Sequence, residues 1–230
     1  MKRLLTIDTE KDFNKNSYEN IKKLHGFVKT LEKSSIKISF FVTCDCLQKF
    51  PSLFRKLAKK HEIALHGYLH ERWDVLGRKE KEERLDKAIK IYKKIFKKSP
   101  KGFRAPQFSA DFELLELLEK KGFEYDSSIV QFPLSQAIFF PSRFHLYLRQ
   151  CNFQEQIKKK KMKIREIPVS SFILPISMFS LRILPQFIFN SFAKLSVLFR
   201  KDKTLLFLIH SYEFNNANFK RLNKFFKILK

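Results

Sequence analysis

Cysteine, glycine and acidic residues are all scarce in this chain of 230 residues, which holds 3 cysteines, 5 glycines and 23 acidic residues. Three cysteines cannot form a closed set of disulfides, and the single residue between Cys44 and Cys46 makes an ordinary bridge between them too tight. A thiolate zinc site would need more cysteines at wider spacing. We therefore interpret the cysteines as small buried residues of a protein in a reducing compartment.

Long hydrophobic runs are also absent from the sequence. The apolar run Leu4–Ile7 stops at Asp8, which leaves it too short for the core of a signal peptide. Two later uncharged stretches, 127–142 and 167–181, contain prolines and fall short of the roughly 18–20 residues of a membrane-spanning helix. We therefore expect a cytoplasmic protein that does not span a bilayer.

Positive charge, in contrast, is in large excess. The chain has 47 Lys and Arg residues, and its formal net charge is +24 at pH 7. Such an excess favours nucleic acid, an anionic membrane surface or an acidic polymer as a partner. Abundant lysine and 27 phenylalanines beside few glycines are equally typical of an A+T-rich genome, so a compositional origin of the charge stays open.

The apolar content is ample for a core, since 44% of the residues are hydrophobic and 15% are aromatic. Short apolar runs predict strands at 4–7, 36–42, 62–65, 102–104, 123–125, 164–169 and 204–209. Helical periodicity predicts helices at 21–31, 50–60, 78–98, 111–121 and 219–229, and the lysine run 158–161 is interpreted as a solvated loop. This alternation predicts one α/β domain over residues 1–230, a distorted (β/α) barrel of about seven parallel strands.

The stretch 172–199 is unusual because it is rich in Ile, Leu and Phe, with Arg182 and Lys194 as its only charges. We treat about 171–200 as a variable apolar insertion in the domain. One interpretation is a pair of helices that pack on the core. The other is a segment that lies at the inner face of an anionic membrane and inserts residues such as Phe187 and Phe189.

Polar residues follow the predicted strands at the points where they end. They are Asp8, Glu10, His66, His70, Arg104, Asp126 and His210. The C-terminal ends of the strands of a parallel barrel share one face, and barrel active sites are built there. We therefore expect these side chains to gather at one mouth of the barrel.

Two of these groups suggest a metal site. His66 and His70 are four residues apart, which on one helical turn would bring both imidazoles to a single ion, although such a pair alone can also be structural. Asp8 and Glu10 would share one side of a strand, where either could instead cap a helix. Two histidines and one carboxylate leave positions on a divalent metal for water and substrate, and the second carboxylate is then available as a base.

Several motifs in order resemble those of the polysaccharide deacetylases with NodB homology, carbohydrate esterase family 4. The matching segments are Leu5-Thr-Ile-Asp8-Thr-Glu10, Phe40-Phe-Val42, Glu62-Ile-Ala-Leu-His66-Gly-Tyr-Leu-His70, Gly102-Phe-Arg104-Ala-Pro106-Gln-Phe-Ser109, Tyr125-Asp126-Ser-Ser128 and Leu208-Ile-His210-Ser-Tyr-Glu213. The resemblance extends from Leu4 to about Phe214. The Asp-x-Glu start is similar to a subgroup linked to extracellular and lipid-linked saccharide biosynthesis.

The resemblance implies a metal-dependent hydrolase that removes N-linked acetyl groups from an acetamido sugar in a polysaccharide or lipid-linked saccharide. It implies that Asp8 is the general base, oriented by Arg104, and that His210 is the general acid. The divalent metal, for which we expect zinc, would be held by His66 and His70. The family often has two adjacent aspartates in its first motif.

Departures from the family pattern affect three assignments. Thr9 follows Asp8 here, so the acidic metal ligand is inferred to be Glu10. Substrate contacts are assigned to Tyr68, Asp126 and Gln107. Gln107 stands where many members have tyrosine, and the backbone N–H near it would help to hold the oxyanion. Asp126 is also our stand-in for the aspartate that tunes the acid histidine, although Asp-Ser-Ser can equally be a turn or cap.

Two other functions stay open at this point. One is hydrolysis of another non-peptide C–N bond on the same fold. The other is a basic nucleic-acid- or glycan-binding module without catalysis, for which clusters such as 220–230 could track phosphates. No recognised nucleic-acid-binding motif is present and the strand-end residues would have no role, so we do not expect nucleic acid as a partner.

Overall fold

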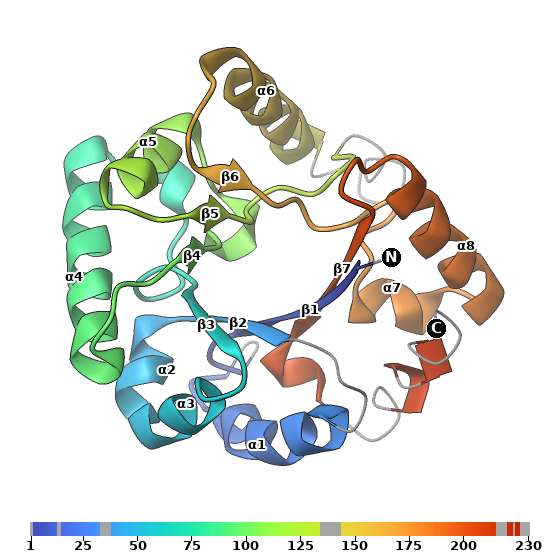
Figure 1. The fold of residues 1–230 in the computed structure, drawn as a ribbon, viewed down its shortest axis with the longest axis horizontal. Helices are drawn as coiled ribbons and strands as arrows, with labels where there is room; N and C mark the ends of the chain where they lie inside the picture. The colour runs from blue at the N-terminus through green and yellow to red at the C-terminus, as the bar shows by residue number, and fades with distance from the viewer. Residues whose placement is uncertain are drawn as a thin grey trace.

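The computed structural model describes residues 2–12, 15–32, 38–133, 144–214, 220–222 and 224–225. Within them a single sheet of seven strands has the order β6-β5-β4-β3-β2-β1-β7, with every neighbouring pair parallel. The strands are β1 (Lys2–Thr9), β2 (Ile38–Val42), β3 (Glu62–Leu65), β4 (Gly102–Phe103), β5 (Tyr125–Asp126), β6 (Arg165–Glu166) and β7 (Thr204–His210). The sheet is curled into a half-barrel, which confirms the predicted fold class (Figure 1).

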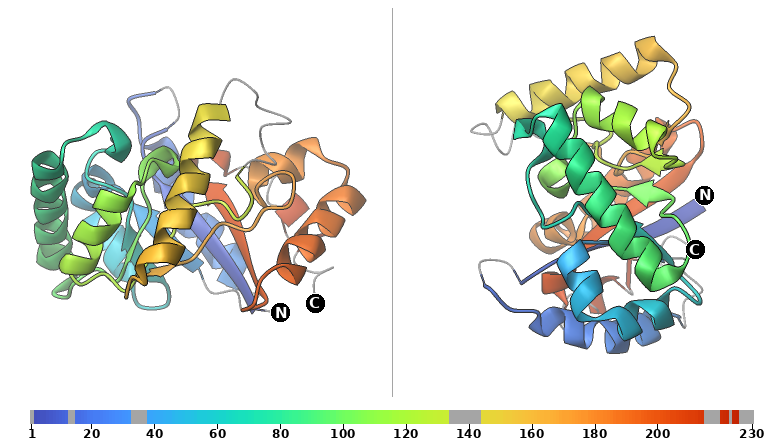
Figure 2. Two further views of the ribbon diagram at one scale, coloured as in Figure 1. Left: turned by 90° about the horizontal axis from the view of Figure 1, so that it is seen from above. Right: turned by 90° about the vertical axis from the view of Figure 1, so that its left-hand side faces the viewer.

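Helices surround the strands in Figure 1. They are α1 (Glu19–Glu32), α2 (Cys44–Lys49), α3 (Pro51–Leu57), α4 (Arg78–Phe96), α5 (Phe112–Lys120), α6 (Phe144–Lys160), α7 (Met178–Ile183) and α8 (Gln186–Leu198), with short 3₁₀ turns η1 (Trp73–Val75), η2 (Pro106–Phe108) and η5 (Ser211–Glu213). Helices α4 and α8 lie at opposite ends of the molecule in Figure 1, as the left-hand view of Figure 2 also shows. None of the helices in the described part of the chain is both long and apolar enough to cross a bilayer.

Two of the helices, α1 and α5, begin where the local sequence supplies both a side-chain cap and an apolar face. Asp12 accepts hydrogen bonds from the backbone N–H groups of Glu19 and Asn20 at the start of α1. Asp111 likewise accepts from the N–H of Leu114 and begins α5. Both helices then contribute apolar residues to the core, and the central strands of the sheet are buried in the manner of parallel sheets.

The gap between β6 and β7 is covered by irregular chain rather than by strand pairing. Val130 and Val169 form one isolated parallel bridge, and Ser177 forms another with Leu208 of β7. The carbonyl of Ile176 accepts a hydrogen bond from the N–H of Leu208 at 2.9 Å. This segment leads directly into α7, so the stretch 172–199 contains the pair of helices that one interpretation predicted.

The lysine run 158–161 is a helix end, which corrects the predicted solvated loop. Residues 144–160 form α6, and Phe153 of this helix is buried while Lys158–Lys160 are solvent-facing. Lysines are favourable in the last turn because they compensate the helix dipole. Of the predicted helix 219–229, the described residues 220–222 and 224–225 are helical, and the rest lie outside the described part, as do residues 134–142 of the uncharged stretch.

Candidate active site

The edge of the sheet at the C-terminal ends of the strands carries the polar residues singled out from the sequence. Asp8 is in register with Phe41 of β2 on one side and with His210 of β7 on the other. His66 and Arg104 directly follow β3 and β4. Because adjacent parallel strands end at the same level, side chains from distant parts of the sequence meet there.

The segment from His66 to His70 is a loop, so the expected helical turn is wrong. Gly67 and His70 both have left-handed backbones, with φ of 74° and 66°. The carboxylate of Glu71 accepts hydrogen bonds from the N–H groups of Tyr68 and Leu69 and holds the loop closed. The loop still brings the imidazole rings of His66 and His70 to a centroid separation of 5.5 Å.

Glu10, His66 and His70 form a cluster whose potential ligand atoms all lie within 4.8 Å of one another. Nε2 of His66 lies 3.8 Å from Oε2 of Glu10, and Nε2 of His70 lies against the same oxygen. That oxygen is buried and receives no hydrogen bond of acceptable geometry from the described residues. A buried carboxylate oxygen that faces two imidazole nitrogens fits a divalent cation, and a set of two nitrogens and one oxygen suits zinc.

The protonation of the two histidines is consistent with this fit. Nδ1 of His66 donates to the backbone carbonyl of Arg104 at 2.9 Å, so its Nε2 lone pair faces the cluster. Burial lowers the pKa of His66 and keeps the ring neutral. Burial also lowers the pKa of His70, but Glu10 outweighs it and the net pKa is raised. The negative charge that favours a proton on His70 would equally favour a metal ion.

Asp8 lies beside this cluster and is paired with Arg104. Oδ1 of Asp8 accepts a hydrogen bond from Nη1 of Arg104 at 2.7 Å, and Oδ2 lies 3.9 Å from Nε2 of His66. Burial raises the pKa of Asp8. The positive charge of Arg104, followed by His66 and His210, lowers it by more, so the net pKa is below the ordinary value. Asp8 is therefore ionised at neutral pH with one oxygen not bonded to the arginine.

Arg104 is fully buried and held on several sides. Its Nε donates to the backbone carbonyl of Ser127 at 2.9 Å, and Nη2 donates to Oγ of the same serine at 2.8 Å. Nη1 also donates to Oγ1 of Thr6, and the guanidinium lies 4.0 Å from the ring centroid of Phe41. Thr6 and Ser127 were not singled out from the sequence, although both stand in segments that carry the family resemblance.

His210 has a carboxylate partner that the sequence reasoning missed. Nδ1 of His210 lies 3.2 Å from Oε2 of Glu213, which also accepts the backbone N–H of His210 at 2.9 Å. Burial lowers the pKa of His210, but Glu213 and Asp8 outweigh burial, so the net pKa is raised. The ring of Tyr212 stacks on His210 at a centroid distance of 5.0 Å. The spacing of three residues, which forms a capping box in η5, was the available signal for Glu213.

Asp126 ends β5 at this edge, but its side chain turns inward, away from His210, which corrects its assignment to substrate and to His210. Its side chain is fully buried and accepts hydrogen bonds from Oγ and the N–H of Ser128, at 2.7 and 3.1 Å. It also lies against Glu166. The turn-and-cap interpretation of Asp-Ser-Ser is the one that the contacts support.

The remaining substrate assignments stay predictions. Tyr68 lies in the loop between the two histidines, and its partly buried ring packs against the core. Gln107 follows Arg104 in η2 with an exposed side chain and a left-handed φ of 54°.

Comparisons with known proteins place this geometry in context. Residues 5–125 match the family model described as polysaccharide deacetylase. A peptidoglycan deacetylase-like protein of Gibberella zeae is 36% identical over 105 residues, covering 44% of this chain and 31% of that protein. The peptidoglycan deacetylase of Helicobacter pylori is 26% identical over 124 residues, covering 54% of this chain and 42% of that protein. The matches therefore span less than half the length of these curated relatives.

Among solved structures, the family 4 carbohydrate esterase from Streptomyces lividans in complex with acetate has a similar fold. The two superpose with a TM-score of 0.59 at 12% sequence identity, and the match covers 99% of this chain and 87% of that chain. At this identity the likeness concerns the fold alone.

Proposed function

The chain belongs to the polysaccharide deacetylase family, and from this premise we propose that it hydrolyses the N-acetyl group of an acetamido sugar with the help of a divalent metal ion. One observation carries the proposal. The buried oxygen of Glu10 faces the imidazoles of both His66 and His70, and this cluster stands beside Asp8 and His210.

Glu10, His66 and His70 would hold the metal, for which zinc is our proposal. When bound, such an ion supplies Lewis-acid polarisation of an amide carbonyl and of attacking water. The neutral ring of His66 and the negative charge of Glu10 supply the ligand types that it needs.

Asp8 is suited to accept the proton of the attacking water. Arg104 occupies its Oδ1, which leaves Oδ2 for this transfer, and the buried bonds of Arg104 to Ser127 fix the orientation of the pair. A carboxylate with a lowered pKa is a modest base, and it stays available over a broad pH range.

His210 is suited to donate a proton to the departing sugar amine. Its bond to Glu213 raises its pKa and favours the imidazolium, which is the form that an acid requires. Asp8 and His210 are in register on neighbouring strands, so the base and the acid approach the same bond from adjacent strands.

The substrate class follows from the family and the relatives. The names of the two curated relatives support an acetylated glycan such as peptidoglycan, and the Asp-x-Glu start supports a lipid-linked saccharide. Binding without catalysis is the weaker candidate, because a base, an acid and a set of metal donors are all present together.

The test is incubation of acetamido-sugar oligomers and lipid-linked acetamido saccharides with zinc-loaded protein, followed by mass spectrometry. We expect loss of acetyl from at least one substrate, abolished by a chelator and restored by added zinc. The Asp8→Asn variant, loaded with zinc to the same level, is the matched control. Equal acetyl loss with wild type and this variant would contradict the mechanism, and no loss from any substrate would contradict the activity.

A further inference from the structure

Helices α7 and α8 expose an unusual share of the large apolar side chains. The most exposed such residues of the described chain are Leu69, Val75, Leu148, Phe179, Ile183, Phe187, Leu198 and Phe199, and the last five come from 178–199. Phe179, Ile183 and Phe187, which we call the apolar face, are 44%, 52% and 72% exposed. These three lie on two consecutive helices joined at Pro185.

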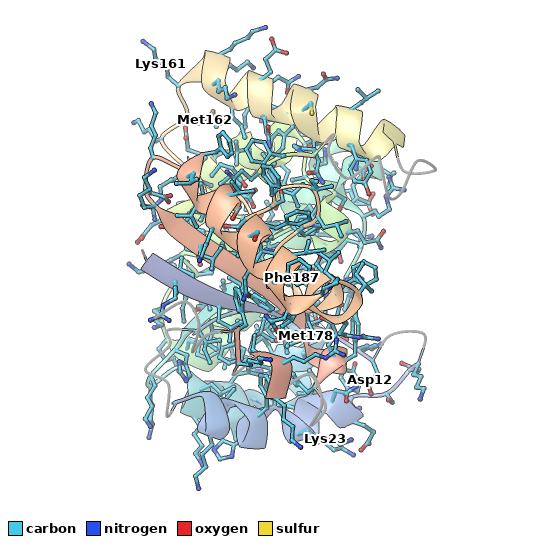
Figure 3. All side chains as sticks on the ribbon, turned by 90° about the vertical axis from the view of Figure 1, so that its right-hand side faces the viewer. Asp12, Lys23, Lys161, Met162, Met178 and Phe187 are labelled. Carbon is cyan, nitrogen blue, oxygen red and sulfur yellow. The ribbon has the colours of Figure 1, made fainter. Side chains whose placement is uncertain are left out.

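The same helices also contribute buried residues to the core, so their outward and inward faces can be told apart. Phe189, two residues after Phe187, is fully buried against Phe207 and Phe225. Insertion of Phe189 into a membrane, which the sequence suggested, is therefore wrong. Phe187 projects from the same helix to the outside and is labelled in Figure 3, where α7 and α8 face the viewer.

The elements that carry the apolar face also carry exposed cations, and this part of the sequence has few acidic residues. Residues 167–201 contain no acidic residue, and the two acidic residues after 166 are Asp202, paired with Arg200, and Glu213, which is buried beside His210. The exposed cations of these elements are Arg182, Lys194, Lys220, Arg221 and Lys224. The guanidinium of Arg221 donates to the backbone carbonyls of Leu181 and Arg182, which holds the 220–225 segment against α7.

This surface adjoins the edge of the sheet that carries the candidate active site. Ser177, the N-cap of α7, bridges to Leu208, two residues before His210 on β7. Helix α7 therefore begins beside the C-terminal end of β7 rather than at the opposite end of the barrel.

We propose that the apolar face, together with Arg182, Lys194 and the basic residues of 220–224, docks the protein on an anionic phospholipid bilayer. Aromatic and aliphatic side chains enter the boundary between headgroups and acyl chains, while lysine and arginine bind anionic headgroups. A cationic surface without acids is complementary to such a bilayer, whereas a protein partner would need its own matching acidic patch. The docking does not depend on the activity. Its use, presentation of a membrane-attached glycan to Asp8 and His210, rests on the proposed function.

The test is co-sedimentation of the full chain with vesicles of phosphatidylcholine alone or mixed with phosphatidylglycerol. We expect binding that needs phosphatidylglycerol and weakens with added salt. The double variant Phe179→Ser/Phe187→Ser should bind at least about tenfold more weakly, whereas Leu148→Ser, on the exposed surface of α6, should bind as wild type. Equal recovery with neutral and anionic vesicles, or equal effects of these two variants, would overturn the proposal.

Two double variants with the same change in net charge distinguish binding through this local surface from binding through the net charge of the whole molecule. Arg182→Glu/Lys194→Glu and Lys87→Glu/Lys90→Glu change the net charge equally, and the second pair lies on α4. We expect at least about tenfold weaker binding for the first pair and little change for the second. Similar losses in both would overturn the proposal. Thermal melting checks that every variant is folded. Deacetylation of a soluble oligomer by Phe179→Ser/Phe187→Ser should match wild type, so a failure of the docking proposal can be distinguished from a failure of the proposed activity.

Discussion

Glu10 presents a buried oxygen to His66 and His70, and these three side chains offer the donors of the proposed metal site. Replacing both histidines by alanine removes two of three protein ligands, and we expect stoichiometric zinc binding to be lost. Metal analysis of the dialysed variant measures this. His25→Ala, on α1, is the matched control and should keep one equivalent; retention of tightly bound zinc by the double variant would contradict the assignment.

Asp8 contributes proton transfer rather than metal binding in the proposed mechanism. Asp8→Asn keeps an oxygen for the bond to Arg104 and removes the basic carboxylate. We expect turnover to fall by about 10²–10⁴-fold with little change in zinc content. Steady-state kinetics on an acetylated substrate, beside metal analysis, checks this, and unchanged turnover would exclude Asp8 as the base.

In the proposed mechanism, Glu213 influences the pH range over which His210 acts as the acid. The net pKa of His210 is raised, so Glu213→Gln should lower it and move the alkaline decline of kcat to lower pH. The stability of the fold depends on pH in the same direction. Because the pKa of His210 is raised in the folded state, the protonated histidine stabilises the fold at pH values below its unfolded pKa, and this stabilisation is lost as the pH rises through the folded pKa. A kcat–pH profile and the NMR titration of His210 measure the shift. An unmoved profile would show that Glu213 has no such influence.

Most of the residues that meet at the site could be predicted, because the ends of adjacent parallel strands share an edge wherever the strands begin in the sequence. Which carboxylate pairs with His210 could not be inferred in this way. It depends on the turn η5, which brings Glu213 back to the ring, while Asp126 turns inward to Ser128. The ligand and catalytic roles themselves stay predictions.

At the scale of elements, the loop between the two histidines depends on Gly67. Its φ is +74°, and a Cβ there would lie 3.0 Å from Nε1 of Trp73 and 3.2 Å from the ring of Pro106. Gly67→Ala should therefore destabilise the fold by about 1–2 kcal/mol or more and weaken zinc binding. Gly26 lies inside α1 with open space around it, so Gly26→Ala should stabilise by about 0.5–1 kcal/mol. Denaturant unfolding measures both changes, and a neutral Gly67→Ala would contradict the argument.

The pairing of β5 with β6 buries two carboxyl groups against each other. Burial, then the charge of Asp126, raises the pKa of Glu166 well above its ordinary value, which favours the protonated carboxyl in the folded state. A raised carboxyl pKa gives stability at low pH that is lost as pH rises through the folded value. Glu166→Gln keeps a donor toward Asp126 and the acceptor for the N–H of Ile129. We expect a flatter profile of unfolding free energy against pH; a profile parallel to wild type would refute this.

Strand positions could be predicted from short apolar runs, but their observed lengths could not. Strands β4, β5 and β6 contain two residues each, because the curled sheet narrows on that side. The helix α6 was missed since its lysine-rich end has little apolar periodicity, and its buried aromatic residues Tyr147 and Phe153 lie before that end. Local apolar patterns in the sequence indicate which face of a helix or strand is buried, but they do not indicate over how many residues neighbouring strands pair.

At the scale of the whole molecule, charge is distributed unevenly. Helices α4 and α5 pair their cations with acids, as in Arg78–Glu116 and Lys121–Asp86. After residue 166, only Asp202 and Glu213 are acidic. An A+T-rich genome would enrich lysine throughout, and it would not remove glutamate from one region, so the composition alone does not account for this asymmetry. The extent of the domain, residues 1–230, stays a prediction.

The central strand β1 has neighbours from very different parts of the chain. It pairs with β2, which follows it closely, and with β7, which is synthesised long afterwards. During translation, Glu10, His66 and His70 leave the ribosome well before His210, so a nascent chain has the proposed metal ligands while it still lacks the proposed acid. Until β7 arrives, one edge of β1 remains open to wrong partners. Under the proposed mechanism, late synthesis of β7 thus keeps the nascent chain inactive during the same interval in which β1 has an unpaired edge.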